Sequence, residues 1–243
     1  MGVRLIAIGG VRHFGQLVKQ TEEEIIRDMD QGKIQTEPSI TDRYLGVLQH
    51  VISEKWKKEG LKIDVCTLRD MGPNAPEHKY GADFIAVLDI KIEGYKLTKG
   101  FLCQAKKESD SIKVLKTQPQ IFFRGPTSVK FGFDQEFIRL KGQANDMLQI
   151  TPASFVIVYS MKGFVVVPAS SVASLSKNNK LYAKSAASFF KEFLMCFIGD
   201  PNLKAWDNIS LESLRDKYRA KRAVMFSLRS TNFDSDQVHL DSF

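Results

Sequence analysis

Residues 81–107 of the chain read GADFIAVLDIKIEGYKLTKGFLCQAKK, and this stretch decides the fold that the sequence predicts. Residues 82–92 are rich in β-forming side chains, Gly94 interrupts the run, and residues 99–105 resume it. Two such runs separated by a short break that contains glycine are typical of a β-hairpin. The stretch therefore predicts two paired strands around which the remaining elements are arranged.

Three polar residues, Asp83, Gln104 and Lys106, lie near the ends of these expected strands. Side chains alternate between the faces of a strand, so Gln104 and Lys106 project to one side while Cys103 and Ala105 project to the other. A carboxylate, an amide and an amine can therefore converge. An ordinary cross-strand ion pair between Asp83 and Lys106 is the structural alternative.

Length and composition bound the protein class. The chain has 243 residues, 43% of them hydrophobic and 26% charged, as in one globular domain with a small accessory unit. Its net charge of +7 favours a polyanionic partner, although many proteins that bind none share such a charge. Cys66, Cys103 and Cys196 are widely spaced, which predicts reduced thiols and neither a disulfide framework nor a zinc site.

The sequence predicts a cytoplasmic protein with no membrane contact. Its first ten residues contain an apolar run too short for a secretory signal, and no later run approaches the length of a membrane span. Gly9, Gly10 and Gly15 lack the Gly-Lys-Ser/Thr ending of a phosphate-binding loop, so we expect them to mark turns.

Hydrophobic periodicity and turn residues predict an α/β fold that forms one compact unit. We expect an N-terminal extension over residues 1–36, a core over 37–172 and a helical C-terminal segment over 173–243. The expected helices cover residues 16–29, 39–58, 134–149, 182–198 and 211–223, and the expected strands outside the hairpin cover 61–68, 154–160 and 164–172.

Two further residues are candidates for the site through their helical positions. Glu37 precedes Tyr44 by seven residues, nearly two turns, and so lies on the inward side at the mouth of its helix. It could complement the helix dipole or bind a metal ion. Gln143 shares a helix face with Leu140 and Met147, where a core amide is the alternative. Glu77, in the loop before the hairpin, is the second candidate for an acidic metal ligand.

Residues 107–133 read as an irregular segment that is rich in cations. A segment of this length within a compact domain is commonly functional, and its cations could follow a phosphate backbone. A solvated insertion is the alternative. The expected nucleic-acid-binding residues are Lys107, Lys113, Lys116, Arg124 and Lys130.

The order helix, three strands, helix, two strands, with an acid on the second strand and Gln-x-Lys on the third, resembles the PD-(D/E)xK nuclease superfamily. It is most similar to the Mrr-type restriction-endonuclease branch. Ala82 stands where the family name has proline, and Gln104 replaces the second acid, as in a variant of that branch. The resemblance covers residues 37–170 and rests on Glu37, Gly81-Ala82-Asp83, Gln104-Ala105-Lys106 and Gln143.

This resemblance implies a restriction-endonuclease-like core, a mixed sheet flanked by helices in αβββαβ order. It implies hydrolysis of DNA phosphodiester bonds with Mg²⁺, or alternatively Mn²⁺, in defence against foreign DNA. The implied catalytic residues are Asp83, Gln104, Lys106, Glu37 and Gln143, and the implied metal ligands are Asp83, Gln104, the Ala105 carbonyl and Glu37.

Two other functions fit the same sequence. One is a catalytically silent module that binds nucleic acid. The other is a scaffold subunit whose phenylalanine-rich segment 182–198 docks a second copy of the chain or another subunit of a defence complex.

Overall fold

A computed structural model describes residues 8–56, 60–69, 81–116, 127–176 and 180–230, and the statements below concern these residues. Two of the candidate site residues, Glu77 and Arg124, lie outside the described residues, as do the ends of the chain.

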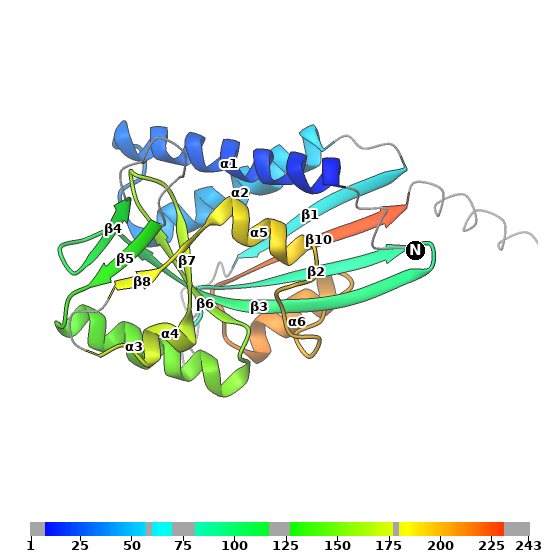
Figure 1. Ribbon diagram of the computed structural model, residues 1–243. Coiled ribbons are helices and arrows are strands. Elements are labelled where there is room, and N and C mark those ends of the chain that lie inside the picture. Colours follow the sequence, from blue (N-terminus) through cyan, green and yellow to red (C-terminus); the bar gives the residue numbers. More distant parts are fainter. Residues whose placement is uncertain (1–7, 57–59, 70–80, 117–126, 177–179, 231–243) are drawn as a thin grey trace, which may run out of the picture.

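Among the described residues, the larger sheet has seven strands and is mixed (Figure 1). Strand β10 runs parallel to β2 and β6 runs parallel to β3, whereas the other neighbours are antiparallel. Its order is β1 (Leu61–Arg69), β10 (Arg222–Ser230), β2 (Phe84–Ile92), β3 (Tyr95–Lys107), β6 (Ser154–Tyr159), β7 (Val165–Pro168) and β9 (Lys184–Ser185).

Helices cover both faces of this sheet, which gives three layers (Figure 1). One face packs against α1 (Ile8–Asp30), α2 (Glu37–Lys55) and α5 (Ala186–Leu194), and the other against α3 (Gln135–Ile150), α4 (Ala169–Ala173) and α6 (Asn208–Lys217). Strand β2 has eight buried residues out of nine, as expected for a strand covered on both faces. The predicted α/β class is therefore confirmed.

The hairpin that the sequence predicts is present as β2 and β3. Its strands pair from Phe84 opposite Cys103 to Ile92 opposite Tyr95, and Gly94 has a φ of 70° in the tight turn between them. A left-handed residue is what a short hairpin turn needs, and glycine adopts it without a steric penalty. The expected helix over 134–149 is present as α3, and Asp134 caps it, because the Asp134 side chain accepts a hydrogen bond from the backbone N–H of Phe137.

The expectation of an irregular segment over 107–133 is wrong for the part that the structure describes. Strands β4 (Ile112–Lys116) and β5 (Thr127–Phe131) form a second sheet with β8 (Lys180–Tyr182), in the order β4-β5-β8. Alternate apolar residues of this small sheet are buried in the core below the larger sheet, which explains why these short stretches are ordered as strands.

The expectation of a wholly helical C-terminal segment is also wrong. Helix α6 ends at Lys217 rather than at residue 223, and Arg219 follows with a left-handed φ of 49°. The chain then enters β10, which lies between β1 and β2. Most of its residues from Arg222 to Leu228 are buried, and their side chains alternate between the two faces of the sheet. The first two strands of the expected core are consequently not adjacent.

Two expected helices have different bounds. Helix α5 begins at Ala186, after the Ser185 cap, and ends at Leu194, so it is much shorter than the segment 182–198. Its Phe189, Phe190 and Phe193 are buried in the main core of the chain itself. At the N-terminus, α1 begins at Ile8, so the nearby glycines lie within a helix and not in turns.

No helix within the described ranges combines the length and the apolar character that crossing a membrane requires.

Candidate functional site

The ends of four elements meet at one edge of the larger sheet: the start of β2, the last third of β3, the first turn of α2 and the start of β10. Phe84 lies opposite Cys103 in β3 and opposite Arg222 in β10. The residues that precede Phe84 and Arg222, namely Asp83 and Lys221, therefore lie next to each other at the end of adjacent parallel strands.

Asp83 is almost completely buried, with 4% of its surface exposed. Its Oδ2 accepts hydrogen bonds from the backbone N–H of Ala105, at 2.9 Å, and from the side-chain amide of Gln104. Its Oδ1 accepts a bond of 2.8 Å from the ammonium of Lys221. A buried charge is tolerated where it is paired and hydrogen-bonded, and these donors satisfy both oxygens.

Gln104 connects two oxygen atoms, one from Asp83 just before β2 and one from Ala105 in β3. Its Nε2 donates to Oδ2 of Asp83 and, at 3.0 Å, to the carbonyl oxygen of Ala105. A single positively polarised group therefore lies between a carboxylate and a carbonyl. Hard divalent cations prefer oxygen ligands, and the carboxylate of Asp83, the carbonyl of Ala105 and the amide oxygen of Gln104 are ligands of this kind. The donor set fits Mg²⁺ or Mn²⁺.

Glu37 lies in the first turn of α2, where Thr36 and Ser39 form a reciprocal capping box that fixes the start of the helix. Its carboxylate is 3.3 Å from the ammonium of Lys106. Burial raises the pKa of the Glu37 carboxyl above its ordinary value, the Lys106 ammonium opposes this shift, and the Asp83 carboxylate adds to it.

Lys106 forms its ion pair with Glu37 and not with Asp83 in the described part of the chain. The cross-strand pair that was the structural alternative for Asp83 and Lys106 is therefore not formed. Lys106 is largely buried, with 9% of its surface exposed.

Gln143 is next to the site, but no hydrogen bond joins its side chain to Lys106. Its Oε1 is buried without a hydrogen-bond partner among the described residues. Its backbone packs against Gly81, which has a φ of 70° and where a Cβ atom would lie 2.7 Å from the Gln143 carbonyl oxygen. Position 81 therefore requires glycine, both for its left-handed backbone conformation and for this close approach.

Lys221 and Arg222 are site residues that the sequence did not identify. Arg222 donates to both carboxylate oxygens of Asp42, at 2.6 and 2.9 Å, and to the carbonyl oxygen of Pro38 at 3.1 Å. These bonds attach the start of β10 to the first turns of α2 and so hold Glu37 near the sheet edge. In the sequence, Lys221 and Arg222 could be recognised only as members of a run of cations, because strand β10 was not predicted.

The four expected nucleic-acid-binding cations that the structure describes do not form one surface. Lys107 donates to the backbone carbonyl of Gln35, at 2.9 Å, beside the site. Lys116 lies close to Glu22, where burial raises the pKa of that carboxyl and the Lys116 ammonium opposes the shift. The two that lie on the exposed face of the small sheet are Lys113 and Lys130.

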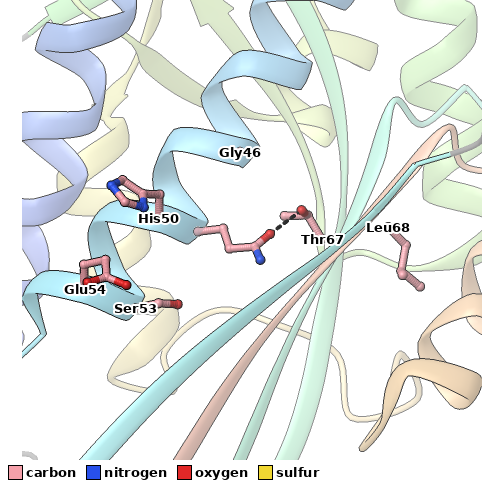
Figure 2. A pocket seen from close by; sticks show the side chains of 7 residues that line it. Gly46, His50, Ser53, Glu54, Thr67 and Leu68 are labelled. Atoms are coloured by element: carbon pink, nitrogen blue, oxygen red, sulfur yellow. Dashed lines mark hydrogen bonds between the residues drawn. The ribbon is translucent and has the colours of Figure 1, made fainter.

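The structure also has an open cavity of about 610 Å³ between α2 and β1. Figure 2 shows the side chains of His50 and Glu54 on the helix and those of Thr67 and Leu68 on the strand, and Thr67 donates to Gln49 at 2.5 Å. None of the polar residues grouped around Asp83 lines this cavity. Because it also lacks Lys and Arg among its lining residues, it offers no match to a phosphate, and we assign it no role.

Comparison of the chain with family models, curated proteins and solved structures finds no match. Within the described ranges, no group of three or more His, Cys, Asp or Glu side chains is arranged to hold a metal ion. A cation beside Asp83 would therefore depend on amide and carbonyl oxygens as well as on carboxylates.

We predict that Glu37→Gln increases the free energy of unfolding at pH 7.5. A carboxyl whose pKa is raised on folding contributes most below its unfolded value, about 4.5, and that contribution is lost as the pH rises through the folded value. Gln removes the buried charge and keeps an acceptor for Lys106. Urea denaturation at pH 7.5 and pH 4.5 should show a gain at the higher pH that shrinks at the lower one.

The matched control has the opposite sign. The hydrogen bond from Arg43 lowers the pKa of Asp28, so its charged form stabilises the fold above the unfolded value and that stability is lost as the pH falls. Asp28→Asn should therefore destabilise the protein at pH 7.5. A Glu37→Gln protein that is less stable than wild type at pH 7.5 would contradict the claim that the ionised Glu37 carboxylate lowers the free energy of unfolding.

Proposed function

We propose that the chain is a metal-dependent nuclease that hydrolyses phosphodiester bonds of DNA. The observation that carries the proposal is the convergence of the Asp83 carboxylate and the Ala105 carbonyl on one point, which the Gln104 amide nitrogen bridges. Lys106 and Glu37 lie at the border of this point. Such a set of oxygen atoms with an adjacent ammonium suits the hydrolysis of a phosphodiester.

The arrangement of the elements supports a restriction-endonuclease-like core. Helix α2, strands β1 to β3, helix α3 and strands β6 and β7 follow one another in the order that the resemblance implies, with β6 parallel to β3. Two features are additions to such a core: β10 enters between β1 and β2, and the small sheet separates β3 from α3.

Asp83, Gln104 through its amide oxygen and the Ala105 carbonyl would hold the metal ion, with Glu37 at the edge of the site. A bound divalent cation supplies positive charge against the charge that develops on the phosphate. Rotation of the Gln104 amide by half a turn replaces its nitrogen with its oxygen at the same place, and amide orientation follows the partners that are present.

Lys106 is the residue that we assign to the phosphate or to the attacking water. Its ammonium is held beside the Glu37 carboxylate, at 3.3 Å. A charged amine at this position stabilises negative charge in the transition state rather than accepting a proton. Gln143 has a buried side-chain oxygen near this end of the sheet that lacks a partner among the described residues, and this oxygen could accept a hydrogen bond from a substrate or a water molecule.

Lys221 is an unexpected part of this proposal, because it is bonded to Asp83. The two carboxylates of Asp83 and Glu37 are balanced by the two ammonium groups of Lys221 and Lys106. The side chain of Lys221 is 34% exposed, whereas that of Asp83 is 5% exposed, so the lysine can move away while the carboxylate stays in place. Lys221 would thus compete with a metal ion for Asp83.

The resemblance to restriction enzymes also supports a setting for this activity. We place the nuclease in the cytoplasm, where it would act in defence against foreign DNA.

We predict that the protein converts supercoiled plasmid to nicked or linear forms with Mg²⁺ or Mn²⁺ and not with EDTA. Asp83→Asn removes the charge that holds the cation, and Lys106→Met removes the ammonium that stabilises the transition state. Each should lower the cleavage rate by roughly 100-fold or more, the effect of losing one preorganised electrostatic contact. Gel analysis of plasmid conversion measures the rate.

The matched control uses the exposed ion pair Lys62–Asp64 on β1, where both side chains are more than half exposed. Lys62→Met and Asp64→Asn should cut DNA at the wild-type rate. Circular dichroism melting of every variant establishes that it is folded. Cleavage by folded Asp83→Asn and Lys106→Met at the rate of these controls would reject the assigned site.

We predict that Lys221→Met binds Mn²⁺ about tenfold more tightly than wild type in the absence of DNA. The variant loses an ammonium that must otherwise leave Asp83, and a hydrogen bond between charged groups contributes about 1.5–3 kcal/mol. Isothermal titration calorimetry measures the affinity. Lys204→Met, at an exposed position outside the site, should match the wild type. Weaker binding of Mn²⁺ by Lys221→Met would mean that the lysine supports the cation rather than competing with it.

A further inference from the structure

The exposed face of the small sheet carries three lysines in one row. Lys113 of β4 lies opposite Lys130 of β5, and Lys130 lies opposite Lys180 of β8. Residues that pair across antiparallel strands share a face, and their Cβ atoms are about 5 Å apart. All three lysines are exposed. The result is a line of positive charge that runs across the strands.

Such a row lowers the stability of the sheet. Like charges directly opposite each other repel, and the described residues offer them little compensation. Lys113 is 2.9 Å from Asp110, but that carboxylate is fully exposed and the pair is screened by solvent. The sequence segments next to these strands, 117–126 and 177–179, contain no Asp or Glu. An anionic partner would remove the repulsion.

A second row on the same face is not charged. Leu115 lies opposite Ser128, which lies opposite Tyr182. Tyr182 is 79% exposed, which is unusual for a large aromatic side chain. It is two residues from Lys180, and a strand rises about 3.3 Å per residue, so its ring is displaced from the lysine row by roughly 7 Å.

The orientation of these rows is fixed by the other face of the sheet. Val114 pairs with Val129, which pairs with Leu181. The two valines are fully buried in the hydrophobic core that also contains residues of α3, α4 and α6. A shift of one residue in the pairing would bury lysines and expose valines. The lysine row and Tyr182 are therefore held toward the solvent by the hydrophobic packing beneath them.

The small sheet is firmly connected to the candidate site. Strand β3 ends at Lys107, directly after Lys106, and β4 begins five residues later (Figure 1). Within this connection, Glu108 accepts hydrogen bonds from the backbone N–H of Val114, at 3.0 Å, and from the side chains of Ser160 and Lys162. The lysine row thus lies on a sheet that a short, hydrogen-bonded connection joins to the strand that carries Lys106.

We infer that this face of the small sheet binds an unpaired strand of nucleic acid, with phosphates on Lys113, Lys130 and Lys180 and a base stacked on Tyr182. The inference rests on the proposed nuclease function and names the form of its substrate next to the cut site. Bases expose their flat faces only when they are unpaired, and sequence-independent binding of single strands combines cations with such aromatic platforms. The paired bases of a duplex offer no face to Tyr182.

The test measures binding of a fluorescein-labelled 12-nucleotide oligothymidylate by fluorescence anisotropy, in EDTA so that cleavage does not interfere. The triple variant Lys113→Gln, Lys130→Gln, Lys180→Gln is compared with a control of equal charge, Lys62→Gln, Lys96→Gln, Lys204→Gln, whose lysines are exposed on other elements. Each phosphate contact on a single strand contributes about 0.7 to the slope of log affinity against log salt. The first triple should lower the slope by about 2, and the control should leave it unchanged.

Tyr182 provides the second arm. Tyr182→Ala should weaken binding of the oligothymidylate by roughly 5- to 150-fold, the effect of losing one stacked base, whereas Tyr182→Phe should keep the affinity. Neither change should alter the binding of a blunt 12-base-pair duplex.

Equal salt slopes for the two triple variants would overturn the inference. So would a Tyr182→Ala protein that binds the single strand as wild type does, because the lysines alone would then recognise only phosphates. The readout is independent of catalysis. If these variants behave as expected but neither plasmid nor single-stranded DNA is cut with Mg²⁺ or Mn²⁺, the binding face stands and the nuclease assignment fails. If DNA is cut but the variants do not show this binding pattern, the nuclease assignment stands and the binding face fails.

Discussion

The structure of the site depends on one buried carboxylate, that of Asp83, and on the donors that keep it buried. Taking a charge out of water costs several kcal/mol unless it is paired and hydrogen-bonded. The backbone N–H of Ala105 and the Gln104 amide come from β3, and the Lys221 ammonium comes from the turn before β10. Asp83 therefore requires that β3 and β10 flank β2 in a fixed register. The bidentate pair between Arg222 and Asp42 extends this requirement to α2, and with it to Glu37.

The sequence predicted what depends on neighbours along the chain and missed what depends on distant pairing. The hairpin could be recognised because Gly94 separates two β-forming runs, and the cap at Asp134 because a capping residue precedes an apolar helical pattern. Asp83 and Gln104 were placed together for the same local reason. Strand β10 could not be recognised as the partner of β2, since nearly 130 residues separate them, and Lys221 was lost with it. The small sheet was missed because its strands are short and interrupted by lysines.

Some groups of the site lower the stability of the fold, as is common at functional sites. Burial raises the pKa of Glu37, and Gln143 keeps a buried oxygen without a partner among the described residues. Neither feature stabilises the fold. Together with the lysines that face one another on the small sheet, they concentrate unfavourable local energies around one end of β3, where a phosphate or a metal ion would relieve them.

The most direct test of the account is the position of Mn²⁺ in crystals of the protein, located by anomalous scattering. We predict a peak in contact with Asp83 and the Ala105 carbonyl oxygen, with the Gln104 amide turned to present its oxygen and with Lys221 displaced from the carboxylate. Manganese favours such oxygen ligands at a little over 2 Å. A peak located instead beside His50 and Glu54, or no peak at Asp83 while Lys221 remains bonded to it, would contradict the account.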